Sequence, residues 1–104
     1  MAFTTSLKLN LTSTSTDLYT SPANTTSIIF NGFVANKSET DTAYFTMTYT
    51  SGTSTITLLN LIPIPVGSTV LIPKKVVSPN AKVSGKVDTI TSGSVDVSLE
   101  ILTV

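Results

Sequence analysis

The sequence predicts an all-β protein, a single antiparallel β-sandwich of about eight short strands. Val, Ile and Thr, whose β-branched side chains favour pleated strands, make up 38 of the 104 residues. Apolar and polar residues alternate with a period of two along most of the chain, and no stretch has helical periodicity. Turn signals recur about every ten residues, which is typical of a sandwich or barrel. A jelly-roll-like or Ig-like arrangement is therefore expected.

The N-terminal part divides into an arm and the start of the sandwich. Residues 1–6 are predicted to be an arm that orders on a neighbouring molecule, and residues 7–104 the β-sandwich domain. Leucines alternate with polar residues over 7–11, which predicts a first strand with one buried face. A short strand follows at 16–20 and ends at Pro22, which begins a turn.

The middle of the chain predicts one long central strand and a hairpin. Residues 26–36 carry apolar side chains on both faces, and Gly32 within them predicts a bulge or a close backbone contact. Residues 42–50 alternate cleanly and reach the hairpin turn at 51–52. The chain then returns as a strand over 55–61.

The C-terminal part predicts several shorter strands. Pro63 and Pro65 lack an N–H and cannot sit in the middle of a sheet. A turn is expected at Ser92-Gly93. The remaining strands are predicted at 69–72, 74–77, 81–87 and 95–102. The predicted core is Ile28, Phe30, Val34, Phe45, Met47, Tyr49, Ile56, Leu58, Val83, Val97, Leu99 and Ile101.

Composition excludes many kinds of catalytic and metal site. The chain has no His, Cys, Trp, Arg or Gln, so Ser–His and Cys–His nucleophile pairs, His/Cys zinc sites and disulfides cannot form within it. Six lysines balance six acidic residues, whereas nucleic-acid binders carry a basic excess. We therefore expect a protein that is not an enzyme, with no cofactor and no nucleic-acid partner.

Two segments bear on targeting. The first residues have neither a basic region nor a long apolar run, so no signal peptide is expected. The most apolar run, 58–66, is short and broken by prolines, whereas a membrane helix needs about 20 apolar residues. No membrane partner is predicted.

The carboxylates offer two weak candidate sites. Glu39 and Asp41 share one polar loop, but a calcium site recruits more oxygen ligands than two. Asp88 and Asp96 flank the last predicted hairpin, and paired carboxylates serve glycosidases. Such enzymes need sugar-binding aromatics, and only seven aromatic residues are present. Both pairs are interpreted as solvated surface, so no catalytic or metal site is predicted.

Some apolar and basic residues are candidates for partner contacts. Several apolar side chains fall out of phase with the predicted core, which indicates either subunit contacts or a second core layer. The region 74–86 holds four lysines, which indicates either a solubilising sheet edge or a contact with an acidic partner surface. The candidate contact residues are Phe3, Phe33, Leu59, Leu61, Lys74 and Lys75.

A series of short motifs resembles small virion proteins of tailed bacteriophages, about 100 residues long and many of them marine or cyanobacterial. The matching segments are Leu18–Pro22, Thr25-Thr26, Ile28–Phe30, Val34–Asn36, Pro63–Ser68, Asp96-Val97 and Leu99–Ile101. Their order and spacing extend the resemblance over about residues 17 to 102. Residues 77–82 depart from it, because relatives carry an acidic, glycine-containing turn there, so local partner contacts are expected to differ.

The resemblance implies a particle component without catalytic residues. The leading hypothesis is a capsid decoration (cement) protein that binds and stabilises the assembled shell, with the major capsid protein or other virion proteins as partners. A homo-oligomer is expected, with a trimer favoured, made in the host cytoplasm and carried on the capsid surface. The alternatives are a tail, baseplate or fibre component, or a host-surface carbohydrate-binding module using an exposed tyrosine such as Tyr44 or Tyr19.

Overall fold

The computed structural model describes residues 2–88 and 95–104, and these form nine strands. The predicted turn at Ser92-Gly93 lies outside the described residues. The strands are β1 (Ala2–Leu11), β2 (Thr16–Thr20), β3 (Ser27–Asn36), β4 (Ala43–Ser51), β5 (Ser54–Ile64), β6 (Thr69–Leu71), β7 (Lys75–Val77), β8 (Lys82–Asp88) and β9 (Val95–Thr103).

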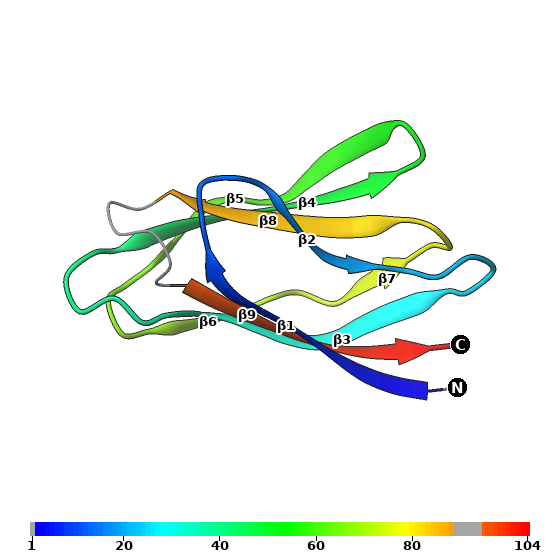
Figure 1. The fold of residues 1–104 in the computed structure, drawn as a ribbon, viewed down its shortest axis with the longest axis horizontal. Coiled ribbons are helices and arrows are strands. Elements are labelled where there is room, and N and C mark those ends of the chain that lie inside the picture. The colour runs from blue at the N-terminus through cyan, green and yellow to red at the C-terminus, as the bar shows by residue number, and fades with distance from the viewer. Residues whose placement is uncertain (1, 89–94) are drawn as a thin grey trace.

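The strands form two antiparallel sheets stacked face to face (Figure 1). Sheet A, the lower layer in Figure 1, has the order β1-β9-β3-β6, and β7 also pairs with β3. Sheet B, the upper layer, has the order β2-β8-β4-β5. The predicted all-β antiparallel sandwich is thus confirmed.

β6 and β7 share one side of β3. β6 pairs with residues 33–35 and β7 with residues 27–29, so the two short strands lie end to end along it. Pro73 lies between them, and it has no N–H to give to a sheet. β6 and β7 therefore occupy one strand position, and they fall within the predicted ranges 69–72 and 74–77.

The first strand begins earlier than predicted. Residues 2–6, expected as part of an arm, belong to β1, which pairs with β9 from Ala2 onwards. Alternation continues through them, because Phe3 and Leu7 face outward while Ser6 faces inward and donates from Oγ to the Leu18 carbonyl oxygen at 2.7 Å. The sequence of residues 2–6 does not show the apolar–polar alternation expected of a strand, because the inward side chains at this sheet edge are small and polar.

The core lies between the two sheets. Seven of the predicted core residues are buried there: Val34, Phe45, Met47, Val83, Val97, Leu99 and Ile101. Ile28 and Phe30 were wrongly predicted to be buried, since Ile29 is fully buried in their place. The register between β3 and β9 shifts between Ile29 and Asn31, and this bulge reverses the inward face of β3. Ile56 is also not in the core, because its side chain is 54% exposed.

Two glycines let neighbouring groups approach closely. At Gly32, a Cβ would lie 2.9 Å from Leu99 Cδ2 and 3.3 Å from the Ser98 carbonyl oxygen, so the predicted close contact is confirmed at this residue, whereas the bulge lies between Ile29 and Asn31. At Gly85, in β8, a Cβ would lie 3.0 Å from Leu18 Cδ1 and 3.0 Å from Phe45 Cε1. The inner layers of the sandwich therefore have no room for side chains at these positions.

Two turns contain glycine at a position with a positive φ. Gly52 has φ +63° in the predicted hairpin turn, and Gly67 has φ +68° in the turn before β6. Such dihedrals favour glycine because it lacks a Cβ. The β4–β5 hairpin projects beyond the rest of sheet B (Figure 1).

Buried hydroxyls link the strands at one end of the core. Ser21 Oγ donates to the Thr25 carbonyl oxygen at 2.6 Å and contacts Ser27 Oγ at 2.8 Å. The Tyr19 hydroxyl contacts the same Ser27 Oγ at 2.8 Å. Some of the abundant hydroxyl residues thus satisfy one another inside the protein, where an unpaired polar group is costly.

Candidate interaction surface

The outer face of sheet A, turned away from sheet B, carries two apolar rows. Strand register places the side chains of each row beside one another across the sheet. The first row is Phe3, Leu102, Ile28 and Val76. The second row is Leu7, Phe33 and Leu71, with the polar Ser98 between Leu7 and Phe33.

Several of these side chains are open to solvent. Phe3 and Leu71 are both 74% exposed, and Leu7 is 62% exposed. Leu9 follows Leu7 on the same strand and is 66% exposed. Single exposed apolar residues are ordinary, whereas a cluster over one sheet face is a candidate interaction surface. We call this cluster, with both rows and Leu9, the apolar face.

The β3 bulge adds an aromatic contact to the apolar face. The Phe3 and Phe30 rings meet edge to face, with centroids 5.8 Å apart and planes at 77°. This geometry suits the ring quadrupoles. The ring of Phe3, on the edge strand, therefore rests against an aromatic side chain of the central strand.

The structure separates the predicted apolar contact residues. Phe3 and Phe33 lie on the apolar face, whereas Leu59 is half-buried and packs against the core. Leu61 lies in β5 of sheet B and is 48% exposed. Its φ is +51°, uncommon for leucine, and its N–H donates to Thr46 Oγ1 at 3.2 Å.

The prediction that Leu7, Leu9 and Leu11 share one buried face was wrong for Leu7 and Leu9, which are exposed. Leu11 alone is buried, because the register of β1 shifts between Lys8 and Leu11. Asn10, within this irregularity, has φ +58°. The asparagine is the one local signal, since Asn tolerates the left-handed region better than most residues.

Lys74 and Lys75, the two basic candidate contact residues, have different surroundings. Lys74 is exposed, but Lys75 Nζ lies 4.2 Å from the centroid of the Tyr49 ring. The Ser78 N–H donates to the Tyr49 hydroxyl at 3.2 Å. Hydrogen bonding with Ser78, aided by the charge of Lys75, lowers the pKa of Tyr49 below its ordinary 10.0. Lys75 thus joins β7 of sheet A to β4 of sheet B.

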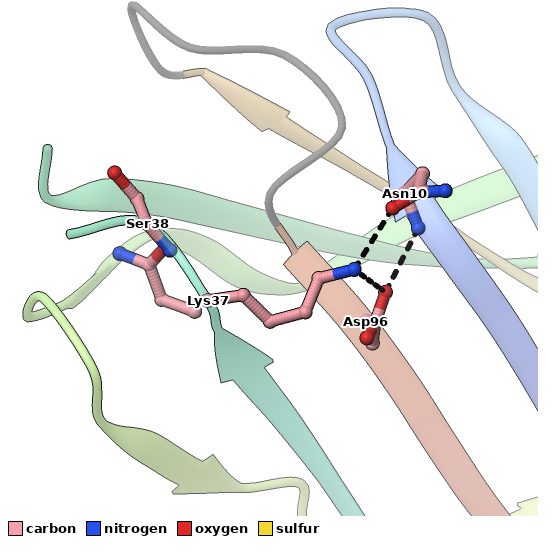
Figure 2. A network of polar contacts seen from close by, with 5 residues as sticks. Asn10, Lys37, Ser38 and Asp96 are labelled. Carbon is pink, nitrogen blue, oxygen red and sulfur yellow. Dashed lines mark hydrogen bonds and ion pairs between the residues drawn. The ribbon is translucent and has the colours of Figure 1, made fainter.

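An ion pair between Lys37 and Asp96 lies at one end of sheet A, beside Asn10 (Figure 2). Lys37 Nζ lies 3.2 Å from Asp96 Oδ1 and donates to Asn10 Oδ1 at 2.9 Å. The Asn10 N–H also donates to Asp96 Oδ1, at 2.9 Å. The contacts join the ends of β1, β3 and β9, and they offset the charge of Asp96.

Asp88 and Asp96, which flank the last predicted hairpin, lie in different sheets of the sandwich. Asp88 ends β8 in sheet B, whereas Asp96 lies in β9 of sheet A and pairs with Lys37. Residues 2–88 and 95–104 contain no group of three potential metal ligands and no detectable pocket. They also contain no helix of the length and hydropathy needed to cross a membrane.

Asp17 should make stability slightly pH-dependent. Its Oδ1 accepts from Ser84 Oγ at 2.9 Å and lies 3.2 Å from Lys82 Nζ. The hydrogen bond to Ser84, then Lys82, lowers the pKa of Asp17 below 3.8. The carboxylate is therefore stabilising at neutral pH, and this contribution is lost as the pH falls through the folded-state value. The Asp17 side chain is 58% exposed, so we expect its carboxylate to contribute less than about 1 kcal/mol to the free energy of unfolding.

Chemical denaturation of the natural protein and Asp17→Asn at pH 7 and pH 2.5 checks this expectation. The stability difference between the two proteins should shrink at the lower pH, where the natural carboxylate is protonated. A difference of equal size at both pH values would contradict it.

Comparison with known proteins finds little close similarity. No family model and no curated protein matches the chain. Among solved structures, it is similar to a pentameric capsid protein isolated from metagenomic phage sequences, with 15% identity and a TM-score of 0.45. The likeness covers 93% of this chain, which spans 59% of that protein. Identity and TM-score this low transfer no function to this chain.

Proposed function

We propose that this protein is a structural component of a bacteriophage virion, a capsid decoration (cement) protein that binds the assembled shell. The observation that carries the proposal is the apolar face, with Phe3, Leu7 and Leu71 largely exposed on a protein without a detectable pocket in its described residues. Such a surface suits contact with another protein better than chemistry on a small molecule.

The strand order supports this proposal. With β6 and β7 counted as one position, the two sheets run 1-9-3-6 and 2-8-4-5, which is the order of a jelly roll. Jelly rolls are common in viral capsid proteins but also occur in lectins, so this support is a fold-level analogy. The sequence motifs that resemble phage virion proteins point in the same direction.

The mechanism would be stabilisation by mass action. A protein that binds the assembled shell, and not its separate subunits, shifts the equilibrium towards the shell. When many copies bind the same shell at once, their combined avidity is high even though each contact is weak. Because the net charge is zero and the surface is apolar, binding should depend little on salt.

Copy number in the virion tests the proposal. Quantitative mass spectrometry of the particle that contains this chain should find copies on the order of hundreds, as icosahedral coats require. About three to twelve copies would instead fit a tail or baseplate component and would overturn the decoration role.

A matched pair of variants tests the surface. Leu71→Asp places a charge on the apolar face, and Ile56→Asp places one on the projecting hairpin, at a side chain that is also more than half exposed. In co-sedimentation with shells lacking the protein, Leu71→Asp should abolish binding and Ile56→Asp should retain it. Equal binding by the two variants would exclude the apolar face as the contact surface.

A further inference from the structure

The sheet edges differ in their protection against pairing with other strands. β2 has five residues and a register shift, and the β6 and β7 edge is broken into three-residue strands. β5 contains Pro63 and two register shifts against β4. Short strands, prolines and bulges are the features by which proteins block edge-to-edge association.

β1 lacks these features over most of its length. Within the described residues it pairs with β9 alone, and Ala2 to Lys8 continue in one unbroken register. This stretch has no proline and no bulge, and its first charge is at Lys8. These seven consecutive residues, the first six of them uncharged, thus form a regular edge strand open to another strand.

The side-chain pattern of this edge reads the same in both directions from Thr5. Thr4 and Ser6 flank it with hydroxyls, and Phe3 and Leu7 lie two residues away on either side. In an antiparallel pair centred on Thr5, Phe3 of one chain would stand opposite Leu7 of the other. Both side chains belong to the apolar face, so the pairing would cover two strongly exposed residues with each other.

We infer that the β1 edge pairs with β1 of a second copy of this chain, antiparallel and with the two-fold axis at Thr5. The contact is isologous, because each copy supplies the same residues to the other. The two A sheets then form one continuous sheet with a joined apolar face. A trimer would need a different surface, since three-fold symmetry cannot place one strand edge against itself.

The contact is small. Seven residues at about 3.3 Å each make an edge about 23 Å long. Multiplied by a sheet thickness of about 10 Å, this buries roughly 500 Å² in total, below the size of stable interfaces. The dimer is therefore weak in solution and gains strength when a surface holds many copies together. The inference does not depend on the virion role, because it rests on the strand edge alone.

A single engineered cysteine tests the register. In the dimer the two Thr5 Cα atoms lie about 4.5–5.5 Å apart, within the range for a disulfide. The chain has no native cysteine, so Thr5→Cys introduces the sole thiol. Phe3→Cys on the same strand is the matched control, because its two copies would lie about 13 Å apart along the sheet.

Under mild oxidation at high protein concentration, Thr5→Cys should form the covalent dimer at least about tenfold faster than Phe3→Cys. Equal rates would overturn the inference. The Thr5→Lys variant places like charges opposite each other at the axis and tests pairing without a crosslink. Sedimentation should show concentration-dependent dimers for the natural protein and monomers for Thr5→Lys. A natural protein that stays monomeric at millimolar concentration, or forms trimers, would also overturn it.

Discussion

Gly85→Val is expected to lower the free energy of unfolding by about 3 kcal/mol. Even a Cβ at this position would lie 3.0 Å from both Leu18 Cδ1 and Phe45 Cε1, and valine adds two methyl groups beyond it. The Leu18 and Phe45 side chains are fully buried, so they cannot move aside into solvent. A domain of this size has about 5–15 kcal/mol of stability, so the loss is a large part of the total.

Lys86→Val is the matched control for this prediction. It introduces the same residue at the next position of β8, where the side chain points away from the core and is half-exposed. Valine suits a strand, so we expect a change within about 0.5 kcal/mol. Denaturant unfolding of both variants makes the comparison. Equal midpoints would contradict the tight packing inferred around Gly85.

Asn36→Ala should lower the free energy of unfolding by about 3 kcal/mol and the Tm by more than about 10 °C. Asn36 is buried at the end of β3, and its side-chain amide joins three segments. Nδ2 donates to the Asp41 carbonyl oxygen at 2.8 Å and to the Ile64 carbonyl oxygen at 3.0 Å. Oδ1 accepts from the Ser38 N–H at 2.9 Å. Alanine removes all three bonds and leaves buried backbone groups without this partner.

Asn31→Ala on the same strand is the control, because Asn31 is exposed on the outer face of sheet A. We expect it to unfold within a few degrees of the natural protein in a thermal melt. If the two alanine variants melt together, the amide of Asn36 does not hold the loop of residues 37–42 in the way described.

The sequence predicted the fold class well because alternation and turn residues are local properties. The strand at 42–50, its hairpin turn and the buried Phe45 and Met47 all follow from a period of two. Gly32 was also correctly singled out, since a glycine inside an apolar strand indicates a close approach.

The faces of β1 and β3 could not be predicted in the same way. One extra residue in a strand reverses which side chains point inward, and periodicity alone does not reveal where that residue lies. The bulge after Ile29 moves Phe30 to the outside, and the shift before Leu11 leaves Leu7 and Leu9 exposed. The two bulges therefore account for much of the apolar face. They explain why Ile28 was assigned to the core and why Leu7 and Leu9 were expected on a buried face, whereas Phe3 and Phe33 were named as candidate contact residues.

The position of β9 has a consequence for how the chain folds. β9 lies between β1 and β3, and the Thr103 side chain donates to the Ala2 carbonyl oxygen, 101 residues away in sequence. Sheet A therefore cannot close during synthesis until β9 has been made. Pairings this distant in sequence slow folding. Until β9 is made, the edges of β1 and β3 that pair with it stay unpaired. A chain truncated before β9 lacks a central strand of sheet A and should accumulate as an aggregation-prone species.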